Sequence, residues 1–441
     1  MSQSPRPPFI VPFTLLVVLA CGGAPNTATL SGANQESSQD ALQNDTAEAG
    51  DLIDSGLPAS CAARANDASN ANARSAPECG PPLPTRAFSS ALCSCEDTSV
   101  AGFLRTRSFQ SSAGEQTPER LGGTVGVNRS YITGGLADVG GSFAVAGTRD
   151  VLFGGVLQVG EDLRFNPAFD VAGIVQVGRD AAFASSLRAA GVIDIGRDLY
   201  RDPGTRFLGL ALLSVGGEQF SEEVSVAPPC ACDAGEIVDV PALVAEARTN
   251  NDNAAIELDS NEIDLVVGIG RVLALPTGRY HLHQIAGAGA LDLHIEGRVS
   301  LFVDDDFYAG GLFRVSLAPD AEFDLFVEDD FALAGAAVIG DPTRPAATRI
   351  YVGGTGDIAI AGLNLFAGNV YAPRANVLVG GVGRVLGSLF GKNIIAAGFL
   401  DVGYDESVRE GNPVCPPPGG DGDTPSDGPA PCDPVDSPII R

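Results

Sequence analysis

The sequence predicts an all-β protein, a right-handed β-solenoid (β-helix) in two stretches, with one short capping helix and disordered tails. Two internal repeats support this prediction. In the first, five glycines follow one another at intervals of 20, 18, 18 and 20 residues, and in the second a seven-residue segment recurs after 24 residues. Periods of this length are typical of solenoids, in which each coil buries its apolar side chains against its neighbours.

The first repeat consists of an alternating stretch, an apolar residue, a glycine and a polar corner. Val159-Gly-Glu-Asp-Leu and Ile195-Gly-Arg-Asp-Leu are two of its copies, and the repeated glycines are Gly140, Gly160, Gly178, Gly196 and Gly216. Alternation of apolar residues indicates strands. We expect Val159, Val177 and Ile195 to stack in one column and the glycines to supply a positive φ at each corner. A β-sandwich of hairpins would explain the strands but not glycines in register.

The second repeat carries acidic residues. Leu301–Phe307 recurs as Leu325–Phe331, which would stack Asp304, Asp305 and Asp306 on Glu328, Asp329 and Asp330. Clustered carboxylates repel one another unless a cation lies between them. Three interpretations stay open, namely solvent-exposed corners, which we favour, a calcium site, and catalytic carboxylates. The lack of tryptophan and the few basic or aromatic residues nearby weigh against a sugar-cleaving site.

One helix is predicted between the two repeats. Asp239 is a good N-cap, Pro241 suits the first turn, and the residues to Arg248 favour a helix. Its place beside a domain boundary near residue 230 suggests that it covers an open end of the sheet.

The amino terminus has the features of a signal peptide. Arg6 precedes an apolar run that is too short to span a membrane and that ends in Ala20-Cys21. Val18-Leu19-Ala20-Cys21 resembles the lipobox of bacterial lipoproteins, which implies cleavage before Cys21 and a lipid on its sulfur. We therefore expect an extracytoplasmic protein, lipid-anchored to the cell membrane or the outer membrane. An ordinary secretory signal is the alternative.

Composition divides the chain into five parts. We assign residues 1–20 to the signal peptide, 21–60 to a disordered tether, and 61–229 to a cysteine-containing entry segment with the first solenoid stretch. Residues 230–410 hold the helix and the second stretch, and residues 411–441 form a Pro/Gly/Asp-rich tail. With 55 acidic against 27 basic residues the net charge is −28. Such a charge excludes nucleic acid as an expected partner.

Eight cysteines remain beside Cys21. An even number outside the cytoplasm predicts disulfides, although the pairing cannot be read from their positions, which are Cys61, Cys79, Cys93, Cys95, Cys230, Cys232, Cys415 and Cys432. Cys93-Ser-Cys95 and Cys230-Ala-Cys232 could instead form a four-thiolate zinc site. Their one-residue spacing does not favour it.

The C-terminal half resembles a known family. The segments Gly368-Asn-Val-Tyr-Ala-Pro-Arg-Ala-Asn-Val-Leu378, Gly387-Ser-Leu-Phe-Gly391, Asn393-Ile-Ile-Ala-Ala397 and Gly403-Tyr-Asp405 are similar to an uncharacterised, β-helical bacterial surface-protein domain of choice-of-anchor and pilus-associated proteins. The resemblance covers about residues 235–410. It implies a structural or adhesive role at the cell surface and carries no catalytic residue.

No catalytic signature is present in the sequence, and we expect no cofactor other than calcium. His281 and His283 share a strand face and His294 follows nearby, so a metal site is conceivable, but a solvated face explains them better. The sequence thus predicts an envelope lipoprotein with a structural or adhesive solenoid. Its partners would be the membrane, through the lipid, and a surface polysaccharide or protein. A carbohydrate-active β-helix enzyme, a lyase or hydrolase that uses residues 304–330, is the alternative.

Overall fold

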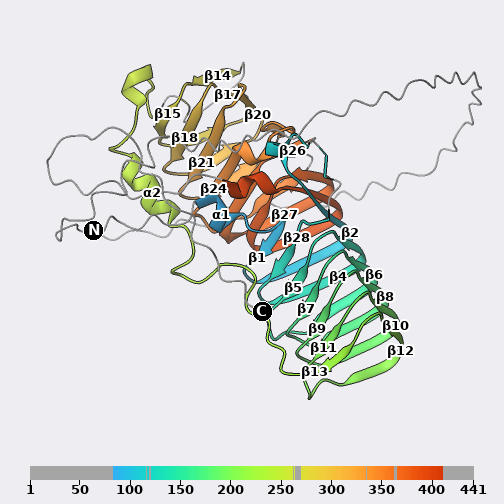
Figure 1. Ribbon diagram of the computed structural model, residues 1–441. Coiled ribbons are helices and arrows are strands. Elements are labelled where there is room, and N and C mark those ends of the chain that lie inside the picture. Colours follow the sequence, from blue (N-terminus) through green and yellow to red (C-terminus); the bar gives the residue numbers. More distant parts are fainter. Residues whose placement is uncertain are drawn as a thin grey trace, which may run out of the picture. The chain divides into compact units, whose positions relative to one another are not determined.

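The computed structural model describes residues 83–410 except 116, 119–120, 262, 264–269, 334 and 362–364. The described chain forms a β-solenoid of about 13 turns, in which strands of successive coils pair in parallel (Figure 1). This confirms the predicted fold class. The expected signal peptide, tether and C-terminal tail lie outside the described residues.

The first stretch begins after helix α1 (Leu83–Ala87) and alternates short and long strands. These are β1 (Leu92–Ser94), β2 (Asp97–Phe109), β3 (Val125–Val127), β4 (Ser130–Val139), β5 (Phe143–Val145), β6 (Val151–Val159), β7 (Leu163–Phe165), β8 (Phe169–Val177), β9 (Ala181–Phe183), β10 (Leu187–Ile195), β11 (Leu199–Arg201), β12 (Phe207–Val215) and β13 (Gln219–Ser221). A 3-10 turn, η2 (Ser111–Ala113), follows β2. The long strands form one wall and the short strands another.

The predicted core column is present. Val159 pairs with Val177, and Val177 pairs with Ile195, in neighbouring parallel strands. All three side chains are buried. The period of 18 to 20 residues is therefore the length of one coil, and each coil shields the apolar side chains of the next one.

The repeated glycines have a different role from the one that the sequence suggested. None of the five glycines from Gly140 to Gly216 adopts a positive φ, so that expectation is wrong. They are needed for close approach, because a Cβ on Gly178 would lie 2.3 Å from the carbonyl oxygen of Gly160. Positive φ occurs instead in mid-strand, at Gly155 (135°) and Gly173 (151°), which pair with each other in adjacent coils.

The second stretch begins with helix α2 (Val240–Ala247) and turn η3 (Asn253–Ile256). Asp239 caps α2 by accepting a hydrogen bond from the Ala242 amide, as predicted. The strands that follow are β14 (Arg271–Leu275), β15 (Gly278–Leu282), β16 (Ile285–Gly287), β17 (Ala290–Ile295), β18 (Arg298–Val303), β19 (Phe307–Ala309), β20 (Leu312–Leu317), β21 (Glu322–Val327), β22 (Phe331–Leu333), β23 (Ala336–Ile339), β24 (Thr348–Val352), β25 (Ile358–Ala361), β26 (Leu365–Ala367), β27 (Asn369–Leu386) and β28 (Leu389–Asp405). Turns η4 (Pro345–Ala347) and η5 (Glu406–Glu410) complete the described chain.

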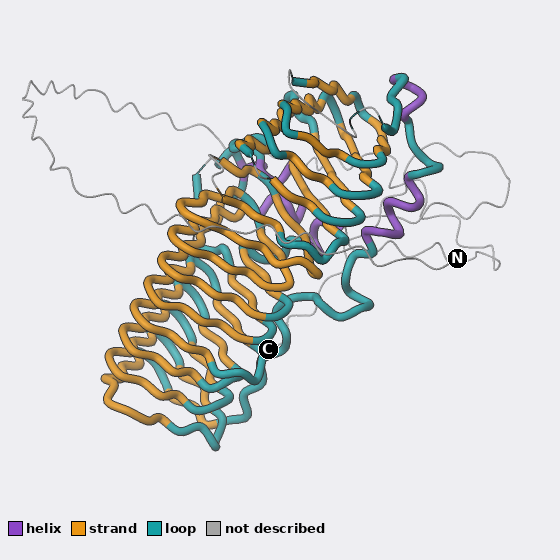
Figure 2. The backbone as a smooth tube through the Cα atoms, turned by 180° about the vertical axis from the view of Figure 1, so that it is seen from behind, coloured by secondary structure: helices purple, strands orange, loops and turns teal. Residues whose placement is uncertain are grey.

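The two stretches are not separate solenoids. The last strand, β28, pairs with the first two: Leu389 is opposite Leu92 in β1, and Thr98 in β2 begins a register with β28 that continues to Phe109. The coils consequently run on without interruption across this seam (Figure 2). The second stretch starts at the far end of the stack and builds toward the first one, so the order of coils in space differs from their order in sequence.

The chain returns from the end of the first stretch along the outside of the coils. Cys93–Cys230 and Cys95–Cys232 disulfides fix this return segment, residues 222–239, beside β1, and the Val238 amide donates to the hydroxyl of Tyr371 in β27. Helix α2 then contacts β15, β18 and β21. It covers the side of three coils instead of an open end, which corrects its expected position.

Stacked aromatic rings lie under this covering layer. Phe302, Phe326, Tyr351, Tyr371 and Phe390 occupy one register column in successive coils, with ring centroids 4.7 to 6.1 Å apart between neighbours. At the seam the column continues as Cys93 and then Gly126. A Cβ on Gly126 would lie 3.1 Å from the sulfur of Cys230, so these small residues leave room for the return segment.

Candidate functional site

The acidic repeats come together at one corner of the solenoid. Val303, the last residue of β18, pairs with Val327, the last residue of β21. Asp304–Asp306 and Glu328–Asp330 follow these strands directly, and Phe307 pairs with Phe331 after them. The two acidic segments are therefore stacked in adjacent coils, as the 24-residue repeat predicts.

Part of the acidic corner is neutralised by the covering helix. Arg248 at the C-terminus of α2 donates from Nε to Asp304 and from Nη2 to Glu328, both at 2.8 Å. His281 Nε2 lies 2.8 Å from the same Asp304 oxygen. Burial raises the pKa of Glu328, and the opposing effect of Arg248 does not cancel this shift. Asp304 and Glu328 thus attach α2 to two coils.

Two other acidic residues bind the backbone of the next coil. Asp306 accepts from the amide of Asp330 (3.2 Å), and Asp330 accepts from the amide of Gly356 (2.8 Å). The first stretch repeats this ladder, because Asp180 accepts from the amide of Asp198 (3.1 Å) and Asp198 from that of Glu218 (2.8 Å). The aspartate that recurs in both sequence repeats thus satisfies a corner amide that has no strand partner.

Asp305 and Asp329, together with Asp306, form the part of the corner that could bind a cation. Oxygens of Asp305, Asp306 and Asp329 lie within 4.8 Å of one another and are exposed to solvent. Burial raises the pKa of Asp306 and of Asp329, and for Asp329 the neighbouring Asp305 and Asp306 add to the shift. Calcium prefers such oxygen ligands but takes six to eight of them, so water would have to supply several.

Replacement of Asp329 by Asn tests whether Asp305 and Asp306 repel the Asp329 carboxylate. The pKa of Asp329 is higher in the folded chain than in the unfolded chain, so the ionised carboxylate destabilises the fold. This loss of stability is complete once the pH has risen through the folded-state pKa. It is absent below the unfolded-state pKa near 4, where the group is protonated in both states. Without calcium, Asp329→Asn should raise Tm at pH 7 by up to about 2 °C and have no effect at pH 3. The control Asp194→Asn, an exposed carboxylate on β10, should leave Tm unchanged. A lower Tm for Asp329→Asn at pH 7 would contradict the assignment.

The three histidines do not converge. His281 in β15 contacts Asp304, whereas His294 in β17 lies 3.1 Å from the hydroxyl of Ser316 in β20. The group of possible metal ligands found among the described residues contains no histidine. His283 follows β15 and is exposed.

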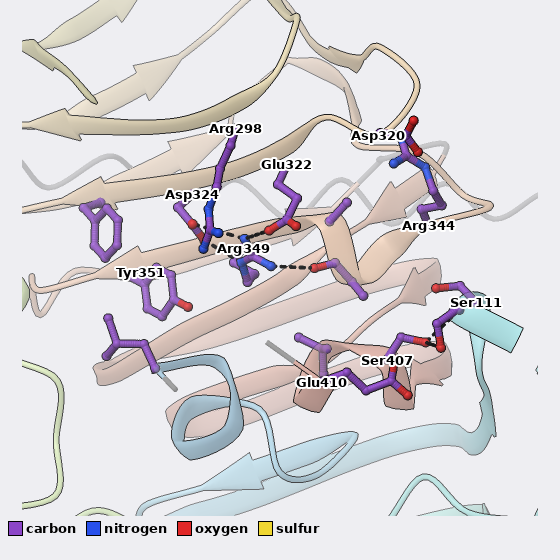
Figure 3. Close-up of a pocket in the computed structure, with 16 residues that line it drawn as sticks. Ser111, Arg298, Asp320, Glu322, Asp324, Arg344, Arg349, Tyr351, Ser407 and Glu410 are labelled. Atoms are coloured by element: carbon purple, nitrogen blue, oxygen red, sulfur yellow. Dashed lines mark hydrogen bonds and ion pairs between the residues drawn. The ribbon is translucent and has the colours of Figure 1, made fainter. Parts of the chain in front are cut away.

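The structure also contains a cleft that the sequence did not indicate. Its volume is about 510 Å³, and it lies between the wall of β18, β21 and β24 and the turns η2 and η5. Arg298, Glu322, Asp324 and Arg349 gather on one wall, with Ser407 opposite (Figure 3). These residues are far apart in sequence, and no motif connects them.

Ion pairs determine the chemistry of this cleft. Arg349 is nearly inaccessible, pairs through two nitrogens with Asp324, and donates from Nη2 to Glu322 at 2.7 Å. Burial alone would lower the pKa of Arg349, but Asp324 outweighs it and the pKa is raised. Burial would raise the pKa of Glu322, but Arg349 lowers it overall. Glu322 is therefore ionised at neutral pH and cannot act as a general acid.

Four of the cysteines form disulfides in the structure. Their sulfurs are paired as Cys93–Cys230 and Cys95–Cys232, so they are not available as thiolates for zinc. Cys21, Cys61, Cys79, Cys415 and Cys432 lie outside the described residues.

Comparison with known protein families bears on the C-terminal part of the chain. Residues 227–410 match the model of a domain of unknown function (DUF7305). This range agrees with the segment that resembles a surface-protein domain. No activity is known for this domain, and the match gives no evidence for a relation to choice-of-anchor or pilus proteins. No curated protein and no solved structure matches the chain. None of the described helices is long and apolar enough to cross a membrane.

Proposed function

We propose that the chain is an extracytoplasmic lipoprotein of the cell envelope whose solenoid serves as a structural or adhesive scaffold. The observation that carries the proposal is the pairing of Cys93-Ser-Cys95 with Cys230-Ala-Cys232 across the return segment. Such pairs persist in oxidising compartments and are rare in the cytoplasm. The signal-like residues 1–20 and the lipobox-like Val18–Cys21 point to the same compartment.

The acidic corner supports a scaffold better than an enzyme. Asp304 and Glu328 hold α2 through Arg248, and Asp306 and Asp330 bind backbone amides. These four carboxylates stabilise the stack of coils. Their recurrence in the two repeats is therefore explained without a catalytic role. A polysaccharide lyase or hydrolase that uses residues 304–330 would need free carboxylates beside a sugar-binding surface. A surface polysaccharide or protein remains the proposed partner of the scaffold.

The anchor is tested by replacing Cys21 with Ser. The lipid is attached to the Cys21 sulfur, and several acyl chains on one residue hold a protein firmly at a membrane. The wild-type chain should fractionate with membranes, whereas Cys21→Ser should appear in the soluble extracytoplasmic fraction, as followed by immunoblot of cell fractions. Cys61→Ser serves as the matched control and should stay with the membrane. Retention of Cys21→Ser in the membrane fraction would refute lipid anchoring at this residue.

A further inference from the structure

The two ends of the solenoid differ in how their strand edges are finished. At the β15 end, the edge is covered by residues 252–260. Asn253 donates to the carbonyl of His281 (2.7 Å) and accepts from its amide (2.9 Å), and the His283 amide donates to Ser260 (2.8 Å). These contacts satisfy backbone groups that a further coil would otherwise use.

The opposite end has no such cover among the described residues. β12 pairs with β10, and β13 pairs with β11, but no described strand pairs with their other edges. Leu213 is 39% exposed, whereas its register partner Ile193 is 2% exposed in the preceding coil. Among the described residues, no strand stacks on β12 and β13 at this end (Figure 1), and the inward Leu213 is left partly exposed.

The outward side chains of β12 are also unusual. Leu210 and Leu212 are 92% and 74% exposed. The register partners of Leu208 and Ser214 in β10 are the charged Arg188 and Asp194, yet β12 itself, Phe207–Val215, contains no charged residue and no proline. Proteins usually protect a long edge strand with such residues. This edge is instead suited to pairing with another strand.

We propose that two copies of the chain join end to end through β12, with twofold symmetry. The chain carries a net charge of −28, so most of its surface repels a second copy, but an uncharged strand brings no like charges together. A twofold axis places β12 of one copy antiparallel to β12 of its partner and satisfies both edges. It covers the inward Leu213 of both copies, while the outward leucines become cross-strand neighbours.

Head-to-tail stacking is disfavoured by the cover at the other end. A copy that continued the solenoid would have to pair its β13 with β15 and its β12 with β14 of the next copy, and β14 pairs with no described strand other than β17. The edge of β15 is already bonded to residues 252–260. A head-to-tail contact would thus leave out the β13 and β15 side of the coil, whereas the twofold contact through β12 closes as a dimer.

Sedimentation equilibrium on the full chain carrying Cys21→Ser tests the proposal. We expect a dimer at micromolar concentration. Leu210→Arg, which places like charges across the twofold axis at an exposed site, should weaken association by at least about a hundredfold. The circular dichroism spectrum of the variant should stay that of the folded chain. Val272→Arg, at an exposed site on β14, should leave the dimer intact. A monomer at 100 µM, concentration-dependent filaments, dissociation by Val272→Arg or an unaffected Leu210→Arg dimer would each overturn the proposal.

Discussion

Replacement of Ile195 by Asp is expected to destabilise the solenoid by about 5 kcal/mol or more. Ile195 is 1% exposed and lies in the core column between Val177 and Val215. The change removes a buried apolar side chain and places a carboxylate where neighbouring coils exclude water. Because the coils above and below depend on this contact, we expect cooperative loss of several coils, measurable as a lower midpoint in urea unfolding.

Arg197, two residues along the same coil, provides the matched control. Its side chain is exposed beyond the glycine and pairs with Asp180 at the surface. Arg197→Ala should shift the unfolding midpoint only slightly, since exposed ion pairs contribute little to stability. Equal midpoints for Ile195→Asp and Arg197→Ala would show that the column is not buried as described.

Removal of both disulfides is expected to cost about 5 kcal/mol or more, which would be the second large effect. Each bond joins residues 137 apart in sequence and so restricts a long loop of the unfolded chain. The two bonds close almost the same loop. Cys95→Ser with Cys232→Ser should therefore cost only about 2 kcal/mol while Cys93–Cys230 remains. Urea unfolding of the double and quadruple variants measures the difference. A small effect of the quadruple variant would contradict the constraint that ties the return segment to β1.

The sequence was sufficient to predict the length and the core residues of one coil. It was not sufficient to predict the order in which the coils are stacked. The column of Val159, Val177 and Ile195 could be predicted because these residues recur at the length of one coil. The 24-residue repeat likewise predicted that Leu301–Phe307 stacks on Leu325–Phe331. The seam of β28 with β1 and β2 could not be predicted, because it joins strands about 300 residues apart that belong to different repeats. The periodicity of the sequence indicates which residues stack within one stretch. It does not indicate which end of one stretch pairs with which end of the other.

The candidate sites show the same limit. The acidic repeat placed Asp304–Asp306 correctly beside Glu328–Asp330, since both lie at one position of the coil. It did not show that Arg248 forms ion pairs with two of these carboxylates, because Arg248 comes from α2, which crosses three coils. The cleft around Arg349 draws its walls from β18 to η5 and from η2 near residue 111, and only the assembled stack brings them together.

The most direct test of an oxidised solenoid whose return segment lies beside β1 is disulfide mapping by mass spectrometry. The protein is purified from its native envelope, unfolded, and alkylated while unreduced. Four cysteines allow three pairings. We predict peptides linked as Cys93–Cys230 and Cys95–Cys232, with none of the four alkylated, because the return segment crosses β1 in this register. Bonds within Cys93-Ser-Cys95 and Cys230-Ala-Cys232 would contradict the position of the return segment beside β1. Four alkylated thiols would contradict the oxidised state on which the extracytoplasmic location rests.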